Sequence, residues 1–150
     1  MPAASEPVAG PDLPHTWRPF GVRMAGILFG TLLIVVVAFA WFAFDDETRA
    51  RFSPFQRGTV VVLGLLFYSV GYAMARSRVV AERDRLVVVN GYRRREYEWA
   101  EVLAVHLPPG APWAVLDLAD GTSQPAMGIQ GSDGSRAQRA VRELRALLTG

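Results

Sequence analysis

The chain has 150 residues, of which 51% are hydrophobic, and its 16 basic and 14 acidic residues give a formal net charge of +2. This near balance excludes a nucleic-acid binder with a dominant basic face, and the lack of cysteine excludes a disulfide framework, a thiolate metal site and a cysteine nucleophile. The apolar residues are concentrated in two blocks, so only about 75 residues, 76–150, can form a water-soluble core, and a large enzyme is excluded.

Residues 1–20 are rich in proline and contain few large apolar side chains. Such a segment cannot bury enough surface to offset the entropy that it would lose on ordering. We therefore predict a disordered, cytoplasmic leader. Trp17 and Arg18, near its end, are expected at the membrane interface, where amphipathic aromatic residues concentrate.

Two uncharged apolar runs, residues 24–44 and 58–75, follow the leader. As helices they would measure about 31 and 27 Å, close to the roughly 30 Å of a bilayer core. We predict a two-span transmembrane hairpin over residues 21–76. Two alternatives stay open here: a buried core hairpin of a soluble protein, and a signal peptide cleaved near Ala40. The apolar run continues to Phe44, which favours an uncleaved anchor.

The arginines around the two runs predict the orientation of the hairpin. Two arginines precede the first run, three lie in the connecting loop, and four closely follow the second run. Because the more basic flanks stay in the cytoplasm, we expect a multi-pass protein of the plasma membrane with both termini cytoplasmic and residues 45–57 outside. No ionisable residue lies inside either run, which argues against a transporter or an intramembrane enzyme.

Small residues recur one helical turn apart in both runs, a spacing that lets helix backbones approach closely in lipid. We expect these residues to pack the hairpin against itself, and a homodimer through the same faces is the alternative. The residues are Gly26 and Gly30 in the first run, and Ser69, Gly71, Ala73 and Ala75 in the second.

Beyond residue 77 the pattern changes to the alternation and β-branched runs that are typical of strands. Asn90-Gly91 is a dipeptide that suits a type I′ hairpin turn, and Asp120-Gly121 predicts a second tight turn. We predict a domain over residues 77–150 with about six short antiparallel strands. These strands are expected at residues 78–82, 85–89, 92–99, 102–107, 113–119 and 122–127.

The chain ends with apolar residues at steps of three and four, which predict one amphipathic helix. Ser135 and Gln138 have capping-box spacing at its start, and Gly150 is suited to close its end. We expect the apolar stripe of this helix to plug the opening of the sheet. The expected core residues include Leu116, Val141, Leu144 and Leu148.

The run from Val79 to Arg95, the Trp99-x-x-Val102 motif and the terminal helix resemble the small bacterial pleckstrin-homology (PH)-like domains of actinobacterial membrane proteins. The similarity is greatest to the group named after low molecular weight protein antigen 6. It covers about residues 60–150 and implies a β-barrel-like sheet capped by a helix, with no known catalytic residue. In this family Trp99 and Val102 correspond to core positions, so the resemblance adds them to the expected core. The expected fold class is therefore a transmembrane α-helical hairpin followed by a small β-rich PH-like domain.

Arginines beyond the second run are the candidate contacts for anionic lipid. Those next to a span add about 1 kcal/mol each of attraction to an anionic leaflet. In the three-arginine run only alternate residues share a strand face, and an ion-paired, solvated face is the alternative. In eukaryotic PH domains that bind inositol phosphates, basic residues surround the first hairpin loop, where Arg83 and Arg85 are expected here. The candidates are Arg76, Arg78, Arg83, Arg85, Arg93 and Arg95.

No pattern in the sequence predicts a catalytic residue, a cofactor or a metal site. Gly128, Gly131 and Gly134 match neither a dinucleotide fingerprint nor a P-loop and are expected in a strand-to-helix loop. His15 and His106 have no second ligand at metal spacing. We therefore hypothesise a non-enzymatic, membrane-anchored adaptor that contacts lipids and docks a protein partner, with no nucleic-acid partner. A sensor of anionic headgroups that uses the six arginines is the alternative.

Overall fold

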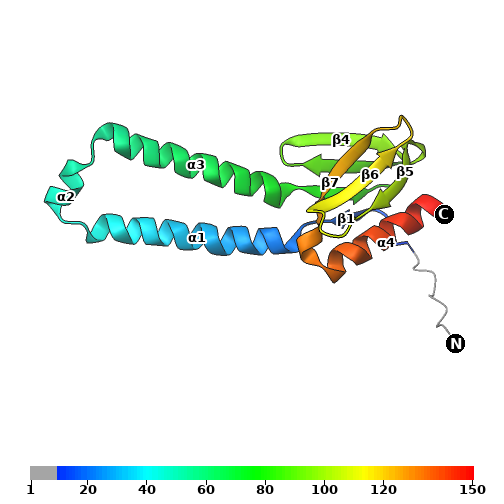
Figure 1. The fold of residues 1–150 in the computed structure, drawn as a ribbon, viewed down its shortest axis with the longest axis horizontal. Coiled ribbons are helices and arrows are strands. Elements are labelled where there is room, and N and C mark those ends of the chain that lie inside the picture. Colours follow the sequence, from blue (N-terminus) through cyan, green and yellow to red (C-terminus); the bar gives the residue numbers. More distant parts are fainter. Residues whose placement is uncertain (1–9) are drawn as a thin grey trace.

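The computed structural model describes residues 10–150 and contains two parts joined end to end (Figure 1). One part is a pair of long helices, α1 (Phe20–Ala43) and α3 (Pro54–Arg76), connected by the short helix α2 (Asp46–Arg51). The other part is a β-rich domain with the C-terminal helix α4 (Ser135–Thr149). This arrangement confirms the predicted helical hairpin followed by a small β-rich domain with one terminal helix.

The two long helices are largely apolar, and none of their residues is buried. Each is long and apolar enough to cross a membrane, judged by length and composition. Both helices also begin before the charge-free runs that predicted them. In α3 the earlier start has a local cause, because Ser53 and Gln56 form a capping box and Pro54 occupies the first turn.

The β domain contains two antiparallel sheets, of order β1-β2-β3-β4 and β5-β6-β7. Six of these strands match predicted ones, and the first is additional. The bounds are β1 (His15–Trp17), β2 (Arg78–Ala81), β3 (Arg85–Asn90), β4 (Arg93–Glu98), β5 (Val102–His106), β6 (Trp113–Leu118) and β7 (Ser123–Gln130), with the short 3-10 helices η1 (Trp99–Glu101) and η2 (Gly131–Asp133).

Strand β1 corrects the prediction of a disordered leader for the described residues 10–20. It pairs with β2, with Trp17 opposite Val79, and the Trp17 side chain is 7% exposed within the core. The Trp17 indole N–H donates to Glu143 Oε2 of α4 at 2.9 Å. The expected interfacial position of Trp17 is therefore wrong, because the chain returns to pair with this segment. The rest of the predicted leader, residues 1–9, lies outside the described residues.

The helical hairpin is an insertion between two paired strands. Strand β1 precedes α1, β2 follows α3, and the two strands are neighbours in one sheet. In Figure 1 the two long helices leave the domain on the same side and run alongside each other. The β domain is therefore built from two stretches, roughly residues 10–19 and 77–150, in place of the single predicted stretch.

The turn between β3 and β4 lies one residue later than predicted. Asn90 pairs with Arg93, so Gly91 and Tyr92 form the turn, and Gly91 has φ +60°. A glycine of positive φ followed by a residue of negative φ is typical of a type II′ turn, so the predicted type I′ turn is wrong. Asn90 instead binds β7: its amide donates to Pro125 O at 2.6 Å, and its side-chain oxygen accepts from Met127 N at 2.9 Å.

The last strand and the last helix also differ from their predicted limits. Strand β7 extends to Gln130, so Gly128 lies inside a strand and not in a loop. A Cβ at Gly128 would lie 2.6 Å from Arg78 Cα, so only glycine allows β7 to cross β2 this closely. Helix α4 has Gly134 as its N-cap, with no side-chain cap, so the capping box predicted at Ser135 is wrong. At the other end Gly150 is the C-cap.

The core lies between the two sheets and α4. Leu116 and Leu144 are fully buried, and Val102 and Val141 are 5% exposed in the same cluster. Trp99 and Leu148 are partly buried at its margin. Figure 1 places α4 along the β domain, where its apolar stripe packs on the cluster.

The small residues of the hairpin do not make the helix-to-helix contacts that the sequence predicted. A Cβ built at Gly26, Gly30 or Gly71 would meet no atom within 4 Å, so these glycines do not bring α1 and α3 together. Ala73 instead lies against the β3–β4 turn, 3.4 Å from a Cβ built at Gly91, and Ser69 hydrogen-bonds to Tyr92 in that turn. Self-packing of the hairpin through its glycines is therefore wrong.

Candidate functional site

Five of the six candidate arginines fall into two groups at opposite ends of the first sheet, and Arg95 lies within β4, opposite Val88. Arg76 ends α3, Arg78 begins β2, and Arg93 directly follows the turn that contacts α3. Arg83 and Arg85 lie at the far end of these strands, in and after the β2–β3 turn. That turn is the first tight hairpin of the domain, because β1 and β2 are joined through the long helices. The equivalence to the first hairpin loop of lipid-binding PH domains stays a prediction.

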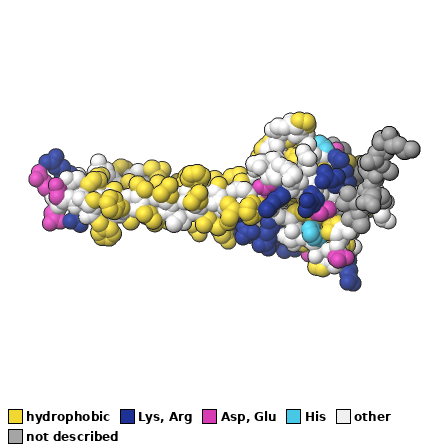
Figure 2. Space-filling view, turned by 90° about the horizontal axis from the view of Figure 1, so that it is seen from below, with side chains coloured by type: hydrophobic (Ala, Val, Ile, Leu, Met, Phe, Trp, Pro, Cys, Tyr) yellow, Lys and Arg dark blue, Asp and Glu magenta, His cyan; other side chains and the backbone are white. Residues whose placement is uncertain are grey.

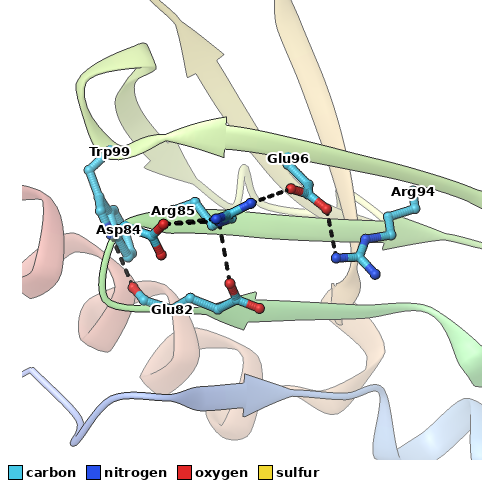
Figure 3. Close-up of polar contacts among 6 residues, drawn as sticks. All are labelled: Glu82, Asp84, Arg85, Arg94, Glu96 and Trp99. Atoms are coloured by element: carbon cyan, nitrogen blue, oxygen red, sulfur yellow. Dashed lines mark hydrogen bonds and ion pairs between the residues drawn. The ribbon is translucent and has the colours of Figure 1, made fainter.

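Arg85 is enclosed by carboxylates on the outer face of the sheet (Figure 3). It bonds to Asp84 at 2.9 Å and to Glu96 at 2.8 Å, and Glu82 lies 3.5 Å away. These hydrogen bonds from Arg85 hold the pKa of the Asp84 and Glu96 carboxyls below their usual values. The Arg85 guanidinium is therefore already paired with carboxylates of the domain.

The same network covers apolar residues of β3. Val87 and Val89 are each 3% exposed, although neither belongs to the core cluster between the sheets. Their cross-strand partners on β4 are Glu96 and Arg94, which bond to each other at 2.6 Å. Long charged side chains commonly cover apolar surface with their aliphatic stems. Arg85, Arg94 and Glu96 therefore form an ion-paired strand face, which is the alternative that the sequence left open.

Tyr92 attaches the β3–β4 turn to the end of α3. Its hydroxyl lies 2.7 Å from Ser69 Oγ and 3.0 Å from Ser69 O, and the Arg76 guanidinium lies over its ring at 5.6 Å. Beside it the buried Ser77 hydroxyl accepts from Gly91 N at 2.9 Å and donates to Ala73 O at 3.0 Å. The turn is therefore fixed against the last two turns of α3.

A second attachment holds the start of α1. The two carboxylate oxygens of Asp133 in η2 accept from Phe20 N at 2.8 Å and Gly21 N at 2.7 Å. Asp133 thus caps a helix more than 100 residues away in sequence, while Pro19, the N-cap residue of α1, provides no side-chain cap. The composition of the 128–134 segment predicted only a loop, because a cap from a distant segment has no local spacing signal.

Strand β4 forms one edge of the first sheet, and in the described part of the chain no strand pairs with its outer side. Its exposed residues are Arg93, Arg94, Arg95, Glu96 and Glu98, and only Tyr97 points into the core. An exposed edge of this kind is a template for an added strand, and charged side chains are the usual protection against non-specific pairing. The edge is thus a candidate docking surface.

The described residues contain no group of three or more His, Asp or Glu side chains arranged to hold a metal ion. His106 Nδ1 lies 3.3 Å from Asp117 on neighbouring strands, and His15 Nε2 lies 4.0 Å from Glu143. Both pairs are isolated and partly exposed. The glycine-rich segment makes no phosphate cradle, because Gly128 packs on β2 and a Cβ at Gly131 would lie 2.3 Å from Ala111 O.

Two antiparallel sheets closed by a C-terminal helix define a domain of the pleckstrin-homology-like class. Residues 76–147 match the bacterial PH domain family, and the chain belongs to this family. The matched region begins after the hairpin and leaves out β1.

The relatives of the chain are mycobacterial proteins. It is 38% identical over 135 residues to an uncharacterised protein of Mycobacterium bovis and to uncharacterised proteins from two strains of Mycobacterium tuberculosis. The similarity covers 90% of this chain and 85% of each relative, so it includes helices of the hairpin as well as the PH domain. No solved structure matches the chain.

Proposed function

We propose that this protein is a non-enzymatic, membrane-anchored docking module that presents the β4 edge of its PH domain to a protein partner at the cytoplasmic face. The anchor is the hairpin of α1 and α3, whose apolar side chains are uncovered along both helices. Figure 2 shows an apolar rod with charged side chains gathered at its tip and at the boundary with the domain. This distribution fits a two-span anchor, since a bilayer accommodates an apolar band between two charged zones.

The orientation follows from the arginines at the two ends of this rod. Arg18, Arg23, Arg76 and Arg78 flank the helices at the domain end, and Arg49, Arg51 and Arg57 lie around α2. The excess at the domain end supports a cytoplasmic PH domain.

The single observation that carries the docking proposal is the unpaired β4 edge. A strand that adds to an edge gains main-chain hydrogen bonds, and its alternate side chains give specificity. Arg93 and Arg95 share one face of β4, and neither forms an ion pair with another described residue. We therefore propose an extended segment with alternate acidic residues as the occupant. The contacts of Tyr92 with α3 and of Asp133 with α1 would hold this edge at a fixed distance from the bilayer.

A second candidate function is the sensing of anionic lipid by Arg76, Arg78, Arg93 and Arg95. The observation in its favour is that the Arg76 guanidinium lies over the Tyr92 ring and that Arg93 directly follows Tyr92, next to the end of α3. Arg85 does not support it, because three carboxylates surround that side chain.

Site-specific photo-cross-linking in mycobacterial membranes tests the docking proposal. A photoreactive residue at Arg93 or Arg95 should give the same protein adduct, and one at Arg94, on the opposite face, should give little. Arg142, exposed on α4, is the matched control and should give none. Adducts with phospholipid in place of protein would favour the lipid sensor, and equal protein labelling at Arg142 would contradict the β4 edge as the docking site.

A further inference from the structure

A pocket of about 350 Å³ lies where the start of α1 meets the β domain. Its walls come from the end of β1, the first turn of α1, the end of β7 and the first turns of α4. Ligand pockets usually begin at about 300 Å³, so this one can hold a small polar group. Its arginines come from around the start of α1 and from α4, whereas the six arginines predicted as lipid contacts lie at or beyond the end of α3.

Three arginines line this pocket: Arg18, Arg23 and Arg136. None of them forms an ion pair with a carboxylate among residues 10–150. Arg136 is held in place by the Phe20 ring, 4.1 Å below its guanidinium carbon. In Figure 2 basic side chains gather at this boundary between the apolar rod and the domain.

The one carboxylate in the pocket wall does not neutralise these arginines. Asp133 uses one oxygen to accept from Phe20 N and the other to accept from Gly21 N. Its charge therefore faces the positive end of the α1 dipole. The pocket keeps an excess of positive charge at the point where α1 leaves the domain.

One buried donor in the pocket wall has no partner in the described part of the chain and is closed to solvent. Gln130, which also lines the pocket, is 4% exposed, and its Nε2 has no hydrogen-bond partner among the described residues. A buried polar group left unsatisfied costs about 1–3 kcal/mol, so such groups are rare in folded proteins unless a ligand or an ordered water completes them.

We infer that this pocket binds the phosphate of an anionic phospholipid headgroup. Guanidinium groups are the donors that phosphate oxygens accept from most readily. The lipid source follows from position, because the pocket borders the first turn of an apolar helix, at the headgroup level of the proposed membrane arrangement. The inference rests on the membrane location in the proposed function and is independent of the β4 edge.

The test uses the full chain in nanodiscs of phosphatidylcholine with a minor fraction of phosphatidylglycerol, and native mass spectrometry counts the phosphatidylglycerol retained. The double variant Arg23→Gln/Arg136→Gln should bind it roughly 25-fold more weakly, since about 1 kcal/mol for each arginine corresponds to about fivefold. Arg139→Gln/Arg142→Gln removes the same charge from exposed positions that do not line the pocket, and it should bind like the wild type.

Near-UV circular dichroism must match the wild type for each variant, since Trp17 lies in the same pocket wall. If Arg139→Gln/Arg142→Gln loses as much lipid as the pocket variant, general surface charge explains the binding and the pocket assignment is wrong.

Inorganic phosphate distinguishes a free phosphate from a lipid phosphate as the ligand of the pocket. It is added to the chain in phosphatidylcholine nanodiscs, and the Trp17 emission is recorded with and without Arg23→Gln/Arg136→Gln in a background in which Trp41, Trp99 and Trp113 are replaced by phenylalanine. A response that requires Arg23 and Arg136, without retention of phosphatidylglycerol, would assign the pocket to a free phosphate and overturn the lipid inference. Failure of the chain to insert into nanodiscs would instead contradict the proposed membrane location.

Discussion

The apolar residues of the helical hairpin are mostly exposed, whereas those of the β domain are largely buried. In the domain Val79, Leu116 and Leu144 are completely buried by neighbours within the chain, whereas no residue of α1 or α3 is buried. The domain therefore carries its stability in its own contacts, and the hairpin depends on its surroundings. The β3–β4 turn is attached to α3 through Tyr92 and Ser77, and η2 is attached to α1 through Asp133.

The largest expected effect comes from removing the Trp17 side chain of β1 from the domain core. Replacing residues 20–76 by a short glycine-rich turn should give a water-soluble domain, because Trp17 already lies opposite Val79. In that protein Trp17→Ala should lower the free energy of unfolding by about 3–5 kcal/mol. Thr16→Ala, exposed on the same strand, should change it by less than about 0.5 kcal/mol. Urea melts measure both, and equal small effects would mean that β1 adds nothing to the core.

The next effect concerns the packing of α4 on the sheets. Leu144 is fully buried, so Leu144→Ala should cost about 2–5 kcal/mol in the same soluble protein. That is a large part of the stability of a domain this small, at roughly 0.05–0.15 kcal/mol per residue. Arg142→Ala on the exposed side of α4 should cost less than about 0.5 kcal/mol. A Leu144 variant as stable as the Arg142 variant would contradict the packing.

A smaller effect is expected at the junction between the two parts. Asp133→Ala removes the cap of α1, and helix caps contribute about 0.5–2 kcal/mol. Hydrogen exchange at the amides of Phe20 and Gly21 should therefore become faster in the full chain. Asp120→Ala is the matched control, because Asp120 bonds only to Thr122 in its own turn. Unchanged exchange at Phe20 and Gly21 would show that the cap does not hold α1 to the domain.

The smallest effect is a pH dependence on the exposed face of the domain. Hydrogen bonds from Arg85 hold the pKa of Asp84 below its usual 3.8 and that of Glu96 below 4.5. The unfolded chain thus binds protons more readily, so this contribution is complete above about pH 4.5 and is lost as the pH falls through the folded-state values. Arg85→Met should reduce the loss of stability between neutral and acidic pH. Arg139→Met, which removes a charge elsewhere, should leave it unchanged.

Local patterns in the sequence predict most of this fold. The apolar runs predict α1 and α3, alternation predicts β2 to β7, and the terminal stripe predicts α4, because each signal lies within the element itself. Strand β1 escapes prediction because three residues between prolines carry no periodicity, and its partner β2 lies 60 residues further along. Asn90 and Asp133 escape for the same reason, since their roles depend on contacts made across the fold.

The position of the hairpin between β1 and β2 limits how the chain can be made. Strand β1 leaves the ribosome before the helices, and its partner follows them, so the PH domain can be completed only when both strands are on the same side of the bilayer. An odd number of crossings would separate them permanently, and a cut near Ala40 would release the strand that carries Trp17. In the proposed two-span arrangement the sheet can therefore close only after both helices have crossed the membrane, whereas a single crossing would leave β2 without β1.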